Sequence, residues 1–307
     1  MTDSIWQGSG VDLDAYLARV GYLADVAPDL ATLRGLHAAH VEAIAFENID
    51  AVLGRAVPLD LDSVQEKIVR RGRGGLCLEQ VVLIAAVLDR IGFTFSALAA
   101  RSRIRTGNKT GPAVHVALCV ELDDKRWLFD VSFGGYGLHE PIRLAEGSLL
   151  DGDWSFDMVR EPHGEHVLRF LRAEGAAELY GFTTDARYPA DFEVLNHYCL
   201  THPRSPFNHR IILQRTQSTV RHVLIGNTLT EMRPGEPATH RELDEGEALS
   251  APEKIFGITL EPGDVQSLKG HGRHGAGRSE LTWTERPPGP SIGNRRDRKD
   301  QYGRDAQ

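Results

Sequence analysis

Three residues in this chain, Cys77, His115 and Asp130, are of the types that together turn a thiol into a nucleophile. The cysteine supplies the attacking sulfur, the imidazole takes its proton, and the carboxylate orients the imidazole. His115 comes 38 residues after the cysteine (115 − 77), and Asp130 follows 15 residues later (130 − 115). The chemistry therefore depends on whether the elements that carry these residues bring them together.

The sequence around Cys77 predicts the start of a buried helix. Eight apolar residues follow at 81–88, and Gly92 lies beyond their end. Free amide groups and the positive end of the helix dipole favour a thiolate, the reactive form of cysteine, in the first turn. Gly74 and Gly75 allow a tight turn and leave space for a ligand beside the sulfur. The alternative is that Cys77 is simply a small buried hydrophobic residue.

The segment at 114–122 alternates like a strand, and it places His115 on the same face as two small residues. Small neighbours leave room beside the imidazole ring. Asp130 is a lone carboxylate in the apolar return strand at 126–131, and a buried carboxylate needs a partner. The alternatives are that His115 is a satisfied core histidine and that Asp130 caps a turn.

A two-residue turn at 123–124 would connect these strands and set Asp130 opposite Ala117. His115 would then be its diagonal neighbour, at roughly 7–8 Å between the backbones. In that arrangement Asp130 fixes the tautomer of His115 and favours imidazolium, while the second ring nitrogen faces Cys77 and takes its proton. We therefore predict a Cys77–His115 ion pair in the resting protein.

The rest of the chain is expected to form the elements that position these residues. Helical periodicity covers 11–92 and predicts a helical domain at 1–92, and alternating segments with hairpin turns make 93–200 a β-barrel or curled sheet. Residues 201–269 are predicted to form an interdomain segment and a smaller α/β unit, in which 253–265 is a helix-and-strand piece. The composition changes sharply at 270–307, where a polar, basic stretch predicts a flexible tail.

Composition excludes several classes of function. The chain has 307 residues, 41% of them hydrophobic, and a formal net charge of −8, which argues against nucleic-acid binding. It has no apolar run of about 18 residues and no visible signal peptide, so we expect no membrane span. The three cysteines fit a reducing cytoplasm, and no paired Cys or His spacing indicates a metal site. Among the other histidines, His37, His40 and His139 are weaker candidates, because none has a carboxylate in a comparable strand.

Five motifs, in this order and spacing, resemble the arylamine N-acetyltransferase family, in particular its bacterial members. They are FENID at 46–50, RGGLC at 73–77, VH at 114–115, WLFDVSFG at 127–134 and HPRSPF at 202–207. The resemblance runs from about position 12 to about position 268 and leaves out the tail. Two positions depart from the family pattern, with Gln80 where Asn is usual and Ser132 where Gly is usual. Ser132 adjoins the acceptor pocket in this pattern, so it can alter the shape of that pocket.

This resemblance implies an α+β fold with a cysteine-protease-like core: a helical N-terminal domain, a central β-barrel and a C-terminal α/β lid. It implies that Cys77 takes an acetyl group from acetyl-CoA and passes it to an arylamine, an arylhydrazine or an arylhydroxylamine in a ping-pong cycle. It also implies that Glu47 pairs with Arg73 to hold the cysteine loop. Three aromatic positions match those that line the acceptor pocket: Phe46, Phe133 and Phe207. Three further positions match the coenzyme A site: Thr110, Gly111 and Gly134.

Three other functions remain open at this point. A thiol hydrolase or transglutaminase-like enzyme uses the same Cys-His-Asp set. An amide synthase of the same family closes a macrocyclic lactam on a carrier-bound chain without CoA. The third alternative is a binding protein without catalytic activity, against which the complete triad argues. The three matching phenylalanines favour small aryl acceptors.

Overall fold

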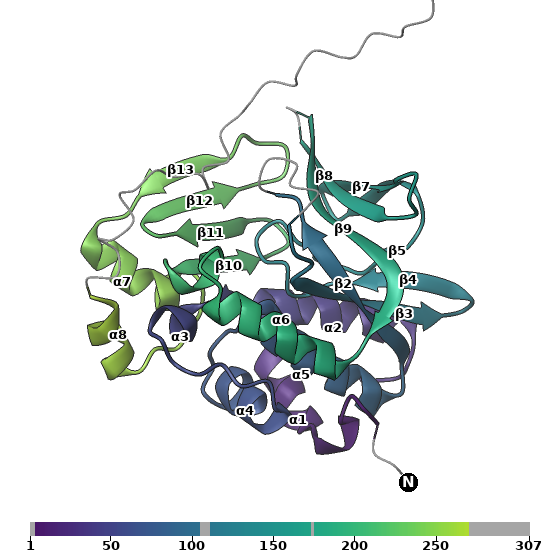
Figure 1. The fold of residues 1–307 in the computed structure, drawn as a ribbon, viewed down its shortest axis with the longest axis horizontal. Helices are drawn as coiled ribbons and strands as arrows, with labels where there is room; N and C mark the ends of the chain where they lie inside the picture. Colours follow the sequence, from purple (N-terminus) through teal and green to yellow (C-terminus); the bar gives the residue numbers. More distant parts are fainter. Residues whose placement is uncertain (1–3, 105–110, 173–174, 270–307) are drawn as a thin grey trace, which may run out of the picture.

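The computed structural model describes residues 4–104, 111–172 and 175–269, and it confirms an α+β fold (Figure 1). The N-terminal helices form a layer on one side, and two β-sheets stand next to each other above it (Figure 1). The helical segments are η1 Gly8–Gly10, α1 Leu13–Val20, α2 Leu30–Ala43, α3 Ile49–Val52, α4 Leu61–Gln65, the π-helix η2 Glu66–Arg70, α5 Cys77–Ile91, α6 Pro189–Thr201, η3 Pro206–Asn208, α7 Glu245–Lys254 and α8 Pro262–Leu268.

The larger sheet contains eight antiparallel strands in the order β5-β4-β3-β2-β9-β8-β7-β6, and it curls into a nearly closed barrel (Figure 1). Its strands are β2 Thr94–Ser102, β3 His115–Leu122, β4 Lys125–Phe129, β5 Ile142–Arg143, β6 Gly147–Asp151, β7 Trp154–Arg160, β8 His166–Arg172 and β9 Gly175–Arg187. A two-residue turn joins β3 to β4, as predicted. Asp123 and Asp124 both have positive φ, at 50° and 56°, as a type I′ turn requires.

The smaller sheet is the lid sheet, with five strands in the order β1-β10-β11-β12-β13. Its strands are β1 Phe46–Glu47, β10 Ile212–Thr216, β11 Arg221–Ile225, β12 Thr228–Met232 and β13 Thr239–Glu242. One apolar cluster joins this sheet to α7 and α8 through residues such as Leu224, Ala251 and Leu268. Because β1 comes from the helical part of the chain, the sheet connects the segment before the cysteine to the C-terminal part.

Strand β3 faces two different apolar clusters, as its alternation predicted. Val116 and Leu118 pack in the large cluster that also contains the buried face of α5. Ala117 and Cys119 pack in the cluster inside the curled sheet. Since α5 lies against β3, the first residue of the helix comes close to the first residue of the strand.

Some predicted elements differ from the structure. Residues 253–265 contain no strand, because α7 ends at Lys254 and α8 begins at Pro262. The long strand β9 was not predicted, and a register shift between Leu168 and Arg169 of β8 interrupts its pairing. The tail at 270–307 lies outside the described residues, and the domain boundaries after 92, 200 and 269 stay predictions.

Candidate active site

Cys77 is the first residue of α5, as predicted, and its side chain is buried. The turn before it is joined to the β1 segment by backbone hydrogen bonds. Gly75 N donates to Ala45 O at 3.3 Å, and Glu47 N donates to Gly75 O at 3.2 Å. Glu79 in the first turn of α5 accepts from Leu76 N at 2.8 Å, which caps the helix next to the sulfur.

The two glycines of this turn permit close packing. A Cβ at Gly74 would lie 2.1 Å from the carbonyl oxygen of Ala45. A Cβ at Gly75 would lie 3.1 Å from the side chain of Glu79. The expectation that the glycines leave space for a ligand was therefore wrong, because neighbouring protein atoms occupy that space.

His115 and Asp130 form the predicted pair. His115 Nε2 donates to Asp130 Oδ2 at 2.8 Å, and both side chains are buried. The register pairs Leu118 with Phe129, so its continuation by one residue sets Asp130 opposite Ala117, as predicted. The second carboxylate oxygen accepts from the backbone of residue 132 at 3.1 Å, which fixes its orientation. Because Nε2 is used by Asp130, the ring nitrogen Nδ1 remains for Cys77.

His37, a buried histidine on α2, accepts a hydrogen bond from the backbone of Asp130. The backbone N–H of Asp130 donates to His37 Nε2 at 3.2 Å, and His37 Nδ1 donates to the carbonyl oxygen of His139 at 2.9 Å. Burial lowers the pKa of His37 to about 4, so the ring is neutral at neutral pH and can accept this hydrogen bond. The sequence placed His37 among the weaker candidates, although its position on an apolar helix face was the available signal.

The protonation of the cysteine and histidine depends on opposing effects. Burial lowers the pKa of His115, but the adjacent Asp130 carboxylate outweighs burial and raises this pKa to about 10. Burial raises the pKa of the Cys77 thiol, and His115 opposes this only in part. The thiol donates to Val114 O at 3.8 Å. The expected lowering of the Cys77 pKa was thus wrong in direction, and the ion pair with His115 stays a prediction.

Cys77 and His115 line a cavity of ≈ 160 Å³ with mainly apolar walls. The three predicted aromatic residues, Phe46, Phe133 and Phe207, all line it too. The rings of Phe46 and Phe207 lie 5.7 Å apart, and Phe133 meets His115 edge-on at 5.0 Å. Apolar and aromatic walls around a few polar groups suit a flat aromatic ligand.

The lid sheet contributes cavity residues that the sequence alone did not single out. They come from β10 and β11 and are Ile212, Gln214, Val223 and Ile225. The alternation along 210–232 was the available signal. It identifies two faces of a strand, but it does not say which face meets the cysteine.

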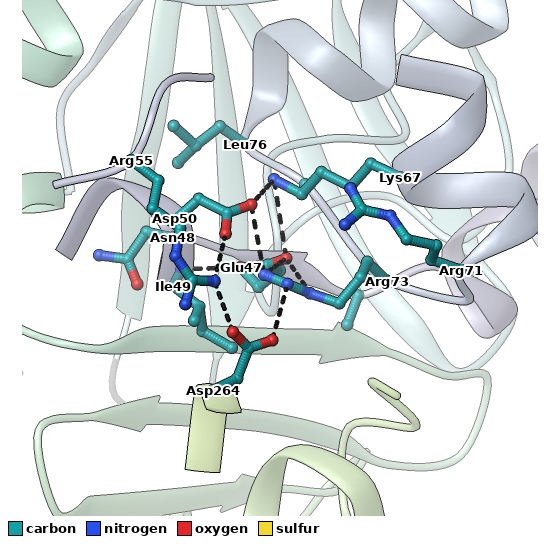
Figure 2. Close-up of polar contacts among 12 residues, drawn as sticks. Glu47, Asn48, Ile49, Asp50, Arg55, Lys67, Arg71, Arg73, Leu76 and Asp264 are labelled. Atoms are coloured by element: carbon teal, nitrogen blue, oxygen red, sulfur yellow. Dashed lines mark hydrogen bonds and ion pairs between the residues drawn. The ribbon is translucent and has the colours of Figure 1, made fainter. Parts of the chain in front are cut away.

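A buried network of charged side chains, here called the cysteine-turn network, adjoins the residues before Cys77 (Figure 2). Arg73 donates to Glu47 Oε1 through Nε at 3.0 Å and Nη2 at 2.7 Å, so the pair implied by the resemblance is formed. Lys67 Nζ lies 2.9 Å from Asp50 and donates to Glu79 at 2.9 Å. Because Glu79 caps α5, the network reaches the helix turn that carries the sulfur.

Asp264 of α8 extends the cysteine-turn network to the C-terminal part of the chain (Figure 2). Its Oδ2 accepts from Arg73 Nη1 at 3.4 Å, and its Oδ1 accepts from Arg55. Asp264 is only 3% exposed. The partners Arg73 and Asp264 are 191 positions apart, and no sequence signal connected them.

The expected coenzyme residues are less completely described. Thr110 lies outside the described residues, and Gly111 and Gly134 are not among the described residues that line the cavity. Gly134 has a φ of +87° and packs closely against the amide of Gln214.

Within the described ranges, no group of three or more His, Cys, Asp or Glu side chains could hold a metal ion. None of the described helices has the length and apolar character needed to span a bilayer.

Known proteins similar to this chain share one family name. A family model described as N-acetyltransferase matches residues 29–265. The arylamine N-acetyltransferase of Mycolicibacterium smegmatis is 34% identical over 255 residues, which are 81% of this chain and 93% of the relative. The solved structure of Nocardia farcinica arylamine N-acetyltransferase has a TM-score of 0.81 and 42% identity, with 86% of this chain and 95% of the other covered. The structure of Mycobacterium marinum arylamine N-acetyltransferase in complex with CoA has a TM-score of 0.77 and 30% identity, with 83% and 97% covered.

Proposed function

Because this chain belongs to the arylamine N-acetyltransferase family, we propose that it transfers an acetyl group from acetyl-CoA to small arylamines, arylhydrazines and arylhydroxylamines. One observation carries the proposal: Cys77 and the His115–Asp130 pair lie at an apolar cavity with three phenylalanines in its wall. A thiol can carry an acyl group as a thioester, and apolar walls suit an aryl ring. The CoA complex of the M. marinum relative supports the choice of donor.

In the first half-reaction, the sulfur of Cys77 attacks the thioester carbonyl of acetyl-CoA. The reactive form of the pair has lost one proton to solvent. The remaining proton resides on His115, because Asp130 raises the pKa of this imidazole to about 10. The new bond joins the Cys77 sulfur to the acetyl carbon, the bond to the CoA sulfur breaks, and His115 passes its proton to the departing thiolate. One thioester replaces another, so the step is nearly balanced in energy.

In the second half-reaction, the nitrogen of the acceptor attacks the acetyl carbon on Cys77. The carbon–sulfur bond breaks, and the sulfur leaves as the thiolate. His115, now neutral, takes the proton that the nitrogen loses, which restores the singly protonated pair. The donor product leaves before the acceptor reacts, so the kinetics are ping-pong.

The remaining residues act around this reaction. The acceptor ring contacts Phe46, Phe133 and Phe207, and Glu47 and Arg73 hold the cysteine turn. The proposed contacts to coenzyme A are Thr110, Gly111 and Gly134. We place the protein in the cytoplasm, because the reaction needs Cys77 as a reduced thiol.

Acetylation in two stages tests this function. The protein is first incubated with acetyl-CoA alone, and its intact mass and the released CoA are measured. We expect one acetyl adduct, located at Cys77 by peptide mapping, with one CoA released for each adduct. Addition of an arylamine should then remove the adduct and yield the acetylated amine. Cys77→Ala, which lacks the sulfur, should form no adduct.

The same experiment separates the alternatives. Acetyl-CoA that stays intact, with no adduct, would favour an amide synthase that uses another acyl donor. Continuous release of free acetate without any amine would favour a thiol hydrolase. Either result contradicts the proposed transfer.

A further inference from the structure

One face of the lid sheet forms a wall of the cavity, and a single amide stands out on it. Phe46 pairs with Gln214 across β1 and β10, and Gln214 pairs with Val223 across β10 and β11. Ile212 and Ile225 form the next pair on the same face. All five residues line the cavity, and Gln214 is the one polar side chain among them.

The orientation of the Gln214 amide is set by the backbone. Gly135 N donates to Gln214 Oε1 at 2.9 Å, and a backbone N–H needs an oxygen acceptor, so the oxygen is fixed at this position. A Cβ at Gly134 would lie 2.5–3.0 Å from three atoms of the amide, which shows how closely this glycine packs against it. The amide nitrogen Nε2 makes no hydrogen bond within the described part of the chain. Its N–H groups are therefore free to donate to a ligand in the cavity.

A free donor in an apolar wall discriminates between ligands. A ligand that places an oxygen acceptor against it forms a hydrogen bond, whereas an apolar ligand covers the N–H and leaves it unpaired. The described residues that line the cavity include no Lys or Arg, and His115 is neutral when the acceptor meets acetyl-Cys77, so a neutral oxygen fits this wall better than a carboxylate does.

We propose that Gln214 Nε2 donates to a neutral carbonyl oxygen carried on the aryl ring of the acceptor, and so selects carbonyl-substituted aryl acceptors over alkyl-substituted ones. This inference rests on the proposed function, since it names the acceptor class of the same cavity. Gln214 determines specificity and takes no part in the bond-breaking steps.

Binding of a matched pair of small molecules tests the proposal without any turnover. Acetophenone and isopropylbenzene have nearly the same shape and differ in the carbonyl group. Their dissociation constants are measured by ligand-observed NMR for the wild type and for two variants, Gln214→Met and Gln214→Glu. Gln214→Met removes the amide. Gln214→Glu keeps an acceptor for Gly135 N–H but has no N–H to offer.

The preference for acetophenone is the dissociation constant of isopropylbenzene divided by that of acetophenone. We expect this preference to be about tenfold larger in the wild type than in Gln214→Met. In Gln214→Glu the preference for acetophenone should fall further than in Gln214→Met, because a carboxylate repels the carbonyl oxygen. Thermal unfolding verifies that each variant is folded, and either variant alone is sufficient. A ratio that stays the same within about twofold in the wild type and the folded variants would overturn the proposal.

Turnover then separates this inference from the proposed function. The kcat/KM ratio of 4-aminoacetophenone to 4-isopropylaniline should fall in Gln214→Met by the same factor. Both acceptors react with the same acetyl-Cys77, so a change in the rate of its formation cancels in this ratio. An unchanged kcat/KM ratio with normal acetyl-Cys77 formation would refute the role of Gln214 and leave the function intact. A changed binding ratio without any acetyl-Cys77 would refute the function and leave the Gln214 site intact.

Discussion

Two buried arginines connect the lid to the rest of the molecule, and their surroundings are opposite in kind. Arg73 is 4% exposed and lies among the carboxylates of Glu47, Asp50 and Asp264 in the cysteine-turn network. Arg221 is fully buried and stacks on Trp154, with its guanidinium carbon 4.0 Å from the ring centre. Its one nearby carboxylate is 3.6 Å away, and none of its three nitrogens has a hydrogen-bond partner in the described structure.

The difference shows in the pKa values of the two groups. Burial lowers the pKa of Arg73, but Glu47 and the other carboxylates outweigh burial and raise it above the ordinary value. Burial lowers the pKa of Arg221 to about 10, and Asp151 compensates only in part. The charge of Arg73 is therefore stabilised by its neighbours, whereas Arg221 holds the lid against the barrel mainly through contact with aromatic rings. The ion pairs of Arg73 fix the position of the cysteine turn, whereas Arg221 mainly contributes packing between the lid sheet and the barrel.

Removal of Arg73 should have the largest effect. Arg73→Met keeps much of the side-chain volume but leaves Glu47 and Asp264 buried with one cation fewer. We expect a loss of about 3–5 kcal/mol in the free energy of unfolding, because uncompensated buried charges are costly. Urea unfolding followed by circular dichroism measures this loss. A loss below about 1 kcal/mol would show that the network is not the stabilising centre described here.

Removal of the charge of Asp264 should have an intermediate effect. Asp264→Asn weakens the contacts to Arg73 and Arg55, and we expect a loss of about 1–3 kcal/mol, as for hydrogen bonds to charged groups. Glu261→Gln is the matched control. Glu261 is the N-cap residue directly before the same helix and pairs with Arg71 at 3.7 Å, but its side chain is 69% exposed. The control should change stability by less than about 0.5 kcal/mol, and equal losses in both variants would contradict the importance of burial.

Replacement of Arg221 by an apolar residue should have a small effect. Arg221→Met removes a poorly paired buried charge and keeps contact with Trp154. Asp151 retains its two backbone donors, the N–H groups of His139 and Glu140. We expect a change within about 1 kcal/mol, since the variant removes the desolvation cost of a guanidinium without hydrogen bonds in the described part of the chain, and this gain offsets the lost attraction to Asp151 at 3.6 Å. Arg221→Ala should be destabilising because it leaves a cavity, and thermal unfolding distinguishes the two variants.

Asp50 lies beside Arg73 and Asp151 lies beside Arg221, and these two carboxylates should contribute to stability with opposite dependence on pH. Burial raises the pKa of Asp50, but Lys67 and Arg73 outweigh it, and the folded-state pKa lies below the ordinary value. Asp50 therefore stabilises the fold above about pH 4, and this contribution is lost as the pH falls through the folded-state pKa. Burial raises the pKa of Asp151 above its ordinary value. Stability is consequently lost at Asp151 as the pH rises from about 4 through that pKa.

Urea unfolding of the wild type, Asp50→Asn and Asp151→Asn between about pH 3 and about pH 7 measures these two slopes. The advantage of the wild type over Asp50→Asn should increase with pH, and its advantage over Asp151→Asn should decrease. Slopes of the same sign would show that the two carboxylates are held in the same way.

The parts of the site that follow from local geometry could be predicted from the sequence. The two-residue turn fixes the pairing of β3 with β4, so the assumed turn length and the alternation together were enough to place His115 and Asp130 on one face. The apolar run after Cys77 predicted the helix that begins there. The α+β fold and the family followed from five motifs, and both are confirmed.

The parts that depend on tertiary contacts could not be predicted. The approach of Asp264 to Arg73 exists only because α8 docks on the β1 segment, and neither residue type nor spacing indicates it. Nothing in the sequence distinguishes Gln214 from other strand residues, because its role depends on how the lid sheet packs next to the cysteine. The pKa of Cys77 was misjudged because the helix start was visible in the sequence while the depth of burial was not.

The turn at Asp123 and Asp124 limits which insertions between β3 and β4 are compatible with an intact site. One extra residue at this exposed turn would slip β4 by one position and exchange its two faces if the turn kept its two-residue geometry. The carboxylate of Asp130 would then point away from the imidazole, although nothing near the sulfur had changed. Two extra residues would restore the parity of the strand. Natural and engineered insertions at this turn should therefore keep activity only when the added residues stay in the loop and leave the pairing of β3 with β4 unchanged.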